Sequence, residues 1–172
     1  MTDEVLLNNE GVDRRVRVVV RWLENVSRAV ESTFELANRA ESFYMMADNL
    51  RGIDYSRDMV ATSPTPDAIP NAIIRAEELG EIYDGIHESA AKRVAQVENA
   101  LALMEDQMEA RALSLYYMSF DEDGRRMYDT WDKVAHRMGY TQDGIMKLRR
   151  RALLHAYDVM PHSERDPIQP AI

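Results

Sequence analysis

The chain has 172 residues, of which 45% are hydrophobic and 30% charged, and its formal net charge at pH 7 is −9. The absence of cysteine excludes disulfides and thiolate zinc sites, and it fits a reducing cytoplasm. No stretch approaches the roughly 20 apolar residues of a membrane span, and the first residues lack the basic and apolar regions of a signal peptide. We therefore expect a cytoplasmic protein without membrane contact.

An apolar stripe near the N-terminus predicts the first helix. It starts at Val12 and continues to Ala47 in alternating steps of four and three residues, a heptad-like pattern. This repeat predicts one long helix from Val12 to about Arg51. Segment 52–70 then contains a glycine and three prolines, which predict a loop.

A second stripe with the same steps of three and four runs from Leu79 to Leu115, and Asp67 is a candidate cap at its start. The acidic turn 120–124 is expected to end this helix. Because neither stripe is stable alone in water, the two helices are expected to fold back on each other. The prediction is an all-α protein with a long antiparallel, coiled-coil-like hairpin over residues 12–118.

The remaining segments complete the expected organisation. Residues 1–11 are polar and are expected to be disordered, and the proline-containing tail 160–172 is expected to be disordered as well. Between hairpin and tail, residues 119–159 are expected to form a DNA-binding region. This region is expected to pack on the end of the preceding helix, at about 100–118.

Residues 131–153 carry the spacing of a helix-turn-helix. Ala135 supplies the small residue where two helices cross, and Gly139 suits a turn that requires a positive φ. Thr141 is a good N-cap for the second helix, which buries Ile145 and Leu148 against the first. The same core is expected to include Trp131, Val134, Met138 and Leu153.

Charge is distributed unevenly along the chain. Residues 124–155 hold eight lysines and arginines against three acids, which gives this stretch a net charge of +5 and leaves −14 for the rest. The asymmetry indicates a basic working surface on an acidic body.

The outward face of the second helix is the predicted DNA reader. Gln142 is expected to read adenine, and Lys147 or Arg150 to read guanine or hold a phosphate. Other basic residues, and the helix N-terminus at Thr141, are better suited to holding phosphates. The predicted contact set is Thr141, Gln142, Asp143, Met146, Lys147, Arg149, Arg150 and Arg151, with Lys133 and Arg137 from the first helix.

Three stretches carry a resemblance to a known family: MEARALSLYYMS (108–119), TWDKVAHRMGY (130–140) and KLRRRALL (147–154). Together they resemble region 4 of sigma-70-type factors, in which a first helix packs beneath the two helices of the DNA reader. The order of hairpin, Tyr-Tyr helix and reader is similar to the RinA-like and ArpU-like late-transcription activators of phages of Gram-positive bacteria.

That resemblance covers about residues 100–158 by motif, and the hairpin only by general architecture. It implies a phage or prophage regulator that acts at promoters in a bacterial host, more as an activator than as a repressor. RNA polymerase is then an expected further partner. Double-stranded DNA is the expected primary partner.

Nothing in the sequence indicates catalysis. The four histidines form no metal-binding pair with carboxylates, and the chain has neither a glycine-rich phosphate loop nor a nucleophile elbow. We expect no enzymatic activity, no metal and no cofactor.

Other interpretations stay open at this point. The acidic hairpin is expected to form a homodimer, but it also suits docking to polymerase or a purely stabilising role. The protein as a whole could instead be an adaptor or inhibitor that acts through its acidic coiled coil, or a phage DNA-packaging protein. A helix-turn-helix with a glycine turn also occurs as a plain packing unit, whose basic run is solvated or pairs with the hairpin.

Overall fold

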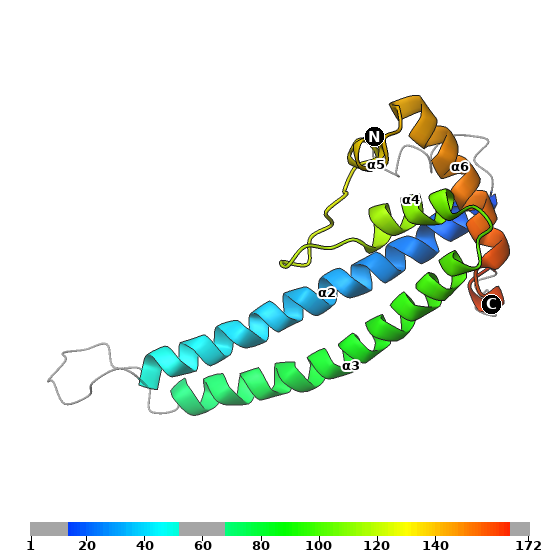
Figure 1. Cartoon of the computed structure of the whole chain (residues 1–172). Coiled ribbons are helices and arrows are strands. Elements are labelled where there is room, and N and C mark those ends of the chain that lie inside the picture. Colours follow the sequence, from blue (N-terminus) through cyan, green and yellow to red (C-terminus); the bar gives the residue numbers. More distant parts are fainter. Residues whose placement is uncertain (1–13, 52–67, 166–172) are drawn as a thin grey trace, which may run out of the picture.

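The structure, a computed structural model, describes residues 14–51 and 68–165. These residues form helices joined by turns and loops, with an isolated β-bridge between Phe120 and Arg126, so the expected all-α class is confirmed. Figure 1 shows the helices, which are α2 (Arg14–Arg51), α3 (Ala68–Ala102), α4 (Gln107–Met118), α5 (Trp131–Met138), α6 (Gln142–Val159) and α7 (His162–Arg165).

The predicted hairpin is confirmed. Helices α2 and α3 run antiparallel and pack together along their length (Figure 1). Val19, Leu23 and Val26 of the predicted stripe are buried on α2, as a period of three and four residues requires. None of the helices in the described part of the chain combines the length and apolar character of a membrane span.

The second hairpin helix begins earlier than predicted, so the loop before it is shorter. Helix α3 begins at Ala68, so Pro70 lies in its first turn, where a missing backbone N–H costs no helical hydrogen bond. Residues 52–67, including the predicted cap Asp67, lie outside the described residues, as does the predicted disordered segment 1–11.

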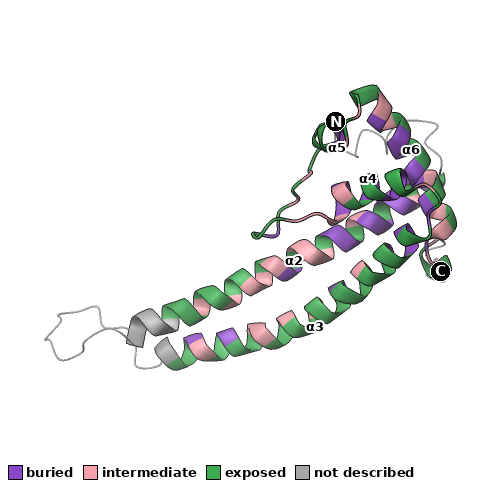
Figure 2. Cartoon of the chain, in the orientation of Figure 1, coloured by how far each residue is buried: buried purple, intermediate pink, exposed green. Residues whose placement is uncertain are grey.

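The core lies at one end of the hairpin. Figure 2 shows buried residues concentrated where α4, α5 and α6 meet the hairpin, and mostly exposed residues along its far half. One continuous hydrophobic cluster takes residues from α2, α3, α4, α5 and α6. The far half of α3 buries mainly small side chains, such as Ala72 and Ala76.

The second long helix was predicted to continue to Leu115, and this prediction is wrong. Helix α3 ends at Ala102, and a turn separates it from α4. The carboxylate of Asp106 accepts hydrogen bonds from the backbone N–H groups of Met108 and Glu109, so it caps a new helix. The break changes the direction of the chain, so that α4 packs against both α2 and α6.

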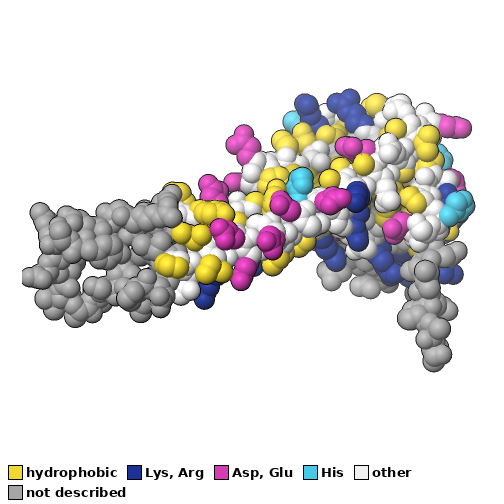
Figure 3. All heavy atoms as spheres, turned by 90° about the horizontal axis from the view of Figure 1, so that it is seen from below, with side chains coloured by type: hydrophobic (Ala, Val, Ile, Leu, Met, Phe, Trp, Pro, Cys, Tyr) yellow, Lys and Arg dark blue, Asp and Glu magenta, His cyan; other side chains and the backbone are white. Residues whose placement is uncertain are grey.

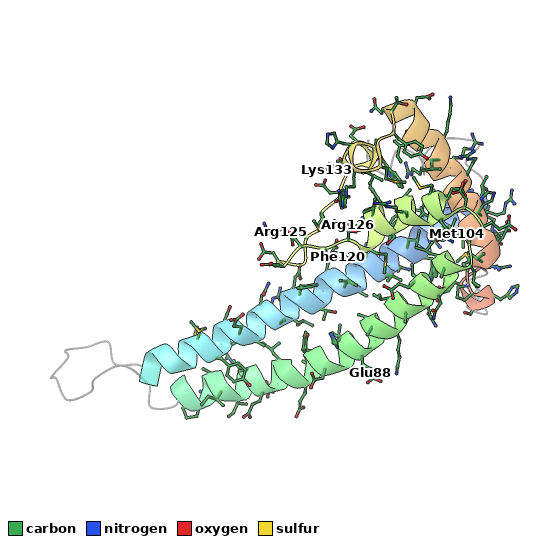
Figure 4. All side chains as sticks on the ribbon, viewed as in Figure 1. Glu88, Met104, Phe120, Arg125, Arg126 and Lys133 are labelled. Atoms are coloured by element: carbon green, nitrogen blue, oxygen red, sulfur yellow. The ribbon has the colours of Figure 1, made fainter. Side chains whose placement is uncertain are left out.

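The helix before the turn begins at the first residue of the predicted helix-turn-helix. Helix α5 starts at Trp131, and the side chain of Thr130 caps it by accepting a hydrogen bond from the N–H of Lys133. The preceding residues 119–130 form an ordered loop across α2 (Figure 4).

The tail was predicted to be disordered from residue 160, which is wrong for residues 160–165. Met160 is buried, and Arg165 donates hydrogen bonds to the carbonyl oxygens of Asp158 and Met160. These contacts hold α7 against the end of α6. Residues 166–172 lie outside the described residues.

Candidate nucleic-acid interface

The turn between α5 and α6 has the geometry that the sequence predicts. Gly139 adopts φ 72° and ψ 29°, in the left-handed region that favours glycine. The N–H of the next residue, Tyr140, donates to the carbonyl of Ala135 at 2.9 Å and closes the end of α5. Thr141 then caps α6 by accepting a hydrogen bond from the N–H of Gly144 at 3.2 Å.

The predicted core of this unit is also confirmed, except that Met138 is only half-buried. The buried members are Trp131, Val134, Ala135, Ile145, Leu148 and Leu153. Helix α4 supports the unit from beneath, because the ring of Tyr116 stacks on Trp131 with centroids 4.5 Å apart. The α5–α6 angle is therefore set by apolar packing on a third helix.

The structure places most of the predicted contact residues at the surface. Eight of the ten are exposed and Met146 is half-buried, whereas Arg149 is buried. The exposed residues are Lys133, Arg137, Thr141, Gln142, Asp143, Lys147, Arg150 and Arg151.

Arg149 was predicted to face outward, and this prediction is wrong. Only 2% of the residue is exposed, and its guanidinium carbon lies 4.9 Å from the ring centroid of Trp131. Burial lowers the pKa of Arg149 to about 10. Its place was readable from the sequence, because it follows Ile145 by four residues and precedes Ala152 by three, on the buried stripe of α6.

Two of the exposed lysines already have partners. Lys133 pairs with Asp129 and Lys147 pairs with Asp143, each at 2.6 Å and each four residues apart. The hydrogen bond from Lys133 lowers the pKa of Asp129. Exposed pairs of this kind contribute little stability in water, so both lysines can exchange their partner for a phosphate.

Arg151 is anchored within the protein. Its Nε lies 3.3 Å from Oε1 of Glu109, while Nδ1 of His155 lies 2.6 Å from Oε2 of the same carboxylate. The Glu109 side chain is only 2% exposed, whereas Arg151 and His155 are 62% and 57% exposed. The cluster ties α4 to α6, and its partners stand too far apart in the chain for a sequence pattern to have indicated it.

Arg126 contributes nothing to the basic surface. Its guanidinium donates to Glu24 at 2.9 and 3.2 Å and to Glu31 at 3.1 Å. Burial lowers the pKa of Arg126, but the hydrogen bonds and charges of the two glutamates outweigh that effect and raise it overall. The function of this arginine is to fasten the loop to α2.

Because several lysines and arginines have partners within the protein, the free basic surface is smaller than the sequence indicates. Within residues 14–51 and 68–165, Arg137 and Arg150 form no ion pair. Arg137 lies in the last turn of α5 and Arg150 in the middle of α6, and Gln142 is exposed at the first position of α6. An exposed amide at the start of a helix and two exposed cations on the same pair of helices suit the edges and phosphates of a duplex groove.

The described residues contain no group of three or more His, Asp or Glu side chains placed to hold a metal. No protein-family model matches the chain, and comparison with curated proteins and with solved structures gave no match. The resemblance to sigma region 4 and to phage late-transcription activators thus stays a prediction from the sequence motifs.

Proposed function

We propose that the protein binds double-stranded DNA through α5 and α6 and acts as a sequence-specific transcription regulator. The observation that supports this best is the left-handed turn at Gly139. It holds α6 with Gln142, Lys147 and Arg150 exposed above an apolar floor. The sequence resemblance extends the proposal to a phage or prophage activator of late genes that acts at promoters and contacts RNA polymerase.

In the proposed complex the N-terminal half of α6 enters the major groove. Gln142 reads an adenine, and Arg150 reads a guanine or holds a phosphate. Lys147 leaves Asp143 for a phosphate oxygen, and Arg137 holds the backbone beside the groove. Arg149 stays beneath the surface and keeps α6 in place.

The test is a triple substitution of Gln142, Lys147 and Arg150 by Ala in the full chain. Genomic fragments are first selected with the wild-type protein, and binding to the enriched site is measured by gel shift. The triple variant is expected to bind at least 100-fold more weakly, with an unchanged helical circular dichroism spectrum. This loss follows from about 1–3 kcal/mol for each base-reading contact.

A matched control changes exposed residues of the hairpin, Lys92→Ala with Arg93→Ala, and is expected to bind nearly as wild type. Equal retention by the α6 variant and this control would remove the α6 face from any role in DNA binding. That result would favour the alternative function, an adaptor that acts through the hairpin.

For the hairpin we propose a second copy of the chain as the partner. A groove of about 390 Å³ lies between α2 and α3, and the side chains of Phe34, Tyr83 and Ala91 help to line it. Large apolar side chains are exposed near the far end, including Met45 and Ile82, and Figure 3 shows hydrophobic side chains gathered there. A two-helix hairpin covers one side of each stripe, and a second hairpin would cover the rest.

Light scattering of the wild-type chain is expected to give the mass of a dimer. Ala91→Glu places a charge in the groove and is expected to yield a monomer, whereas Ser89→Glu, an exposed neighbour that does not line the groove, is expected to leave the dimer intact. A wild-type monomer at concentrations of tens of micromolar would contradict this assignment.

A further inference from the structure

A second set of cations lies on the hairpin, away from the helix-turn-helix. Arg14, Arg17, Arg21 and Arg28 are all exposed on α2. Their spacings of three, four and seven residues bring them within a sector of roughly 60° on a helix that turns about 100° per residue. They extend over about 21 Å at 1.5 Å per residue. We call this set the α2 arginine face.

The α2 arginine face points away from the protein core. Seven residues of the same helix segment are buried, and they lie on its opposite side: Val16, Val19, Val20, Trp22, Leu23, Val26 and Ser27. The four arginines therefore take no part in the packing of the core. They are aligned along the solvent-facing side of α2.

No carboxylate of the described residues neutralises this face. None of the four arginines forms an ion pair within residues 14–51 and 68–165. The single acid in segment 14–28 is Glu24, and it is engaged with Arg126. In a chain of net charge −9, four aligned guanidiniums without an ion pair among the described residues concentrate positive potential where an anionic partner would be attracted.

The face lies at the same end of the molecule as the helix-turn-helix. Helix α2 packs against α6, and Figure 1 shows its N-terminal part beside α6. On the far half of α3 most of the exposed charges are acidic, with Glu77, Glu78 and Glu81 among them beside a single arginine, Arg75. In Figure 3, Lys and Arg side chains gather at the α4–α6 end, and Asp and Glu side chains dominate along the hairpin.

We propose that the α2 arginine face binds the sugar-phosphate backbone of double-stranded DNA, outside the groove occupied by α6. Along the helix axis the arginines stand about 4.5, 6 and 10.5 Å apart, and each long side chain can adjust its reach to a phosphate. Guanidinium groups bind phosphate oxygens through paired hydrogen bonds. The proposal rests on the proposed function and adds a sequence-independent contact to it.

Two sources of the phosphates share this chemistry. The backbone can belong to the duplex held by α6, bent around the end of the molecule, or to a second duplex held at the same time. A duplex of 60 base pairs that binds more tightly than one of 20 base pairs, through the four arginines, indicates the bent duplex. Simultaneous capture of two differently labelled 20-base-pair duplexes indicates the second.

The experiment compares three full-length proteins on a labelled duplex that contains the selected site and on a scrambled duplex. The first protein is wild type and the second has all four arginines of the face changed to Gln. The third is a charge-matched control with four exposed cations of the hairpin changed to Gln, namely Arg39, Arg75, Lys92 and Arg93. Dissociation constants are measured between 50 and 300 mM salt.

The arginine-face variant is expected to bind both duplexes 10- to 100-fold more weakly near physiological salt. The slope of log affinity against log salt is expected to fall in magnitude by about 2–4, since each lost phosphate contact removes about 0.9. The control, with the same change in net charge, is expected to lose less than threefold. An unchanged slope in the arginine-face variant would overturn the proposal.

The α6 triple variant, measured in the same series, separates this inference from the proposed function. If only the α6 variant loses affinity, the arginine face has no role and the α6 assignment stands. If only the arginine-face variant loses affinity, the arginine face binds DNA and the α6 assignment is wrong. If light scattering without DNA shows that the four substitutions dissociate a dimer, the face binds the acidic α3 of a second copy, and the DNA proposal is wrong.

Discussion

Two adjacent arginines on α6 have different environments. A helix turns about 100° per residue, so Arg149 falls on the side of Ile145 and Leu148, while Arg150 falls on the solvent side. The buried guanidinium lies over the indole of Trp131 and is desolvated, which its lowered pKa reflects. The three consecutive arginines therefore differ: Arg149 packs in the core, Arg150 is exposed to solvent, and Arg151 pairs with a carboxylate of α4.

We predict that Arg149→Met leaves DNA affinity within threefold of wild type. Methionine retains most of the packing volume, so the free energy of unfolding is expected to change by less than about 1.5 kcal/mol. Arg149→Ala leaves a void beside Trp131 and is expected to cost about 2–4 kcal/mol. Urea unfolding and gel shift check both variants. A tenfold loss of affinity in a stable Arg149→Met protein would mean that the guanidinium reaches DNA.

Asp143 is the acidic residue at the start of the proposed DNA-binding surface of α6. It is exposed in the first turn of α6 and pairs with Lys147 at 2.6 Å. We predict that Asp143→Asn tightens binding about two- to fivefold, because a repulsive charge is removed and Lys147 is released for phosphate. Fluorescence anisotropy at two salt concentrations is the measurement, with Asp84→Asn on α3 as the control. A weaker Asp143→Asn complex would show that the carboxylate accepts a hydrogen bond from a base.

At the scale of elements, the loop before α5 determines where the helix-turn-helix sits on the hairpin. Arg126 joins it to Glu24 and Glu31 of α2. Beside it, Gly124 adopts φ 76° and lies against Phe34, so closely that a Cβ would stand 2.3 Å from the Cγ of that ring. Through these contacts the acidic loop 119–130 is fixed to the surface of α2.

We predict opposite effects for two glycine-to-alanine substitutions. Gly124→Ala requires a left-handed alanine and a displaced Phe34, and is expected to cost about 2–4 kcal/mol of unfolding free energy. Gly85→Ala, within α3 and with open space where the new methyl group would stand, is expected to add about 0.5–1 kcal/mol. Thermal unfolding measures both.

A second variant tests the cause of the loss. Adding Phe34→Ala to Gly124→Ala removes the ring from the path of the new methyl group and is expected to restore part of the stability. If the double variant loses, relative to wild type, the full sum of the two single losses in unfolding free energy, steric overlap with Phe34 is not the cause.

At the scale of the whole molecule, hairpin and helix-turn-helix share one core. The hydrophobic cluster is continuous from Val16 on α2 to Met160 after α6, so the division of the chain at residues 118 and 119 marks no boundary between cores. A three-helix unit made of α4, α5 and α6 would bury little apolar surface alone, and the hairpin supplies the missing surface. Both parts are therefore expected to unfold together.

The two tryptophans make this testable, since Trp22 lies on α2 and Trp131 on α5. In Trp22→Phe, fluorescence reports Trp131 alone, while far-ultraviolet circular dichroism is dominated by the two long helices. We predict coincident urea transitions for the two signals. A fluorescence transition at lower urea would show that the helix-turn-helix unfolds independently.

Local patterns in the sequence were sufficient for the two hairpin helices and for the turn, but not for the end of α3. Apolar spacings of three and four residues predicted the hairpin, and Ala135, Gly139 and Thr141 predicted the geometry of the turn, because these signals depend on neighbours within one helix turn. The break at Asp106 was missed, since its capping signal lies inside a stripe that continues on either side.

Which charges remain free depends on tertiary packing. Arg126 meets Glu24 and Glu31 across 102 and 95 residues, and Glu109 meets His155 across 46. Such pairs leave no periodic trace, because they depend on how whole helices pack and not on local spacing. Local sequence thus specified the helices and the turn, whereas the packing of those helices buried Arg149 and left four arginines of α2 on one open face.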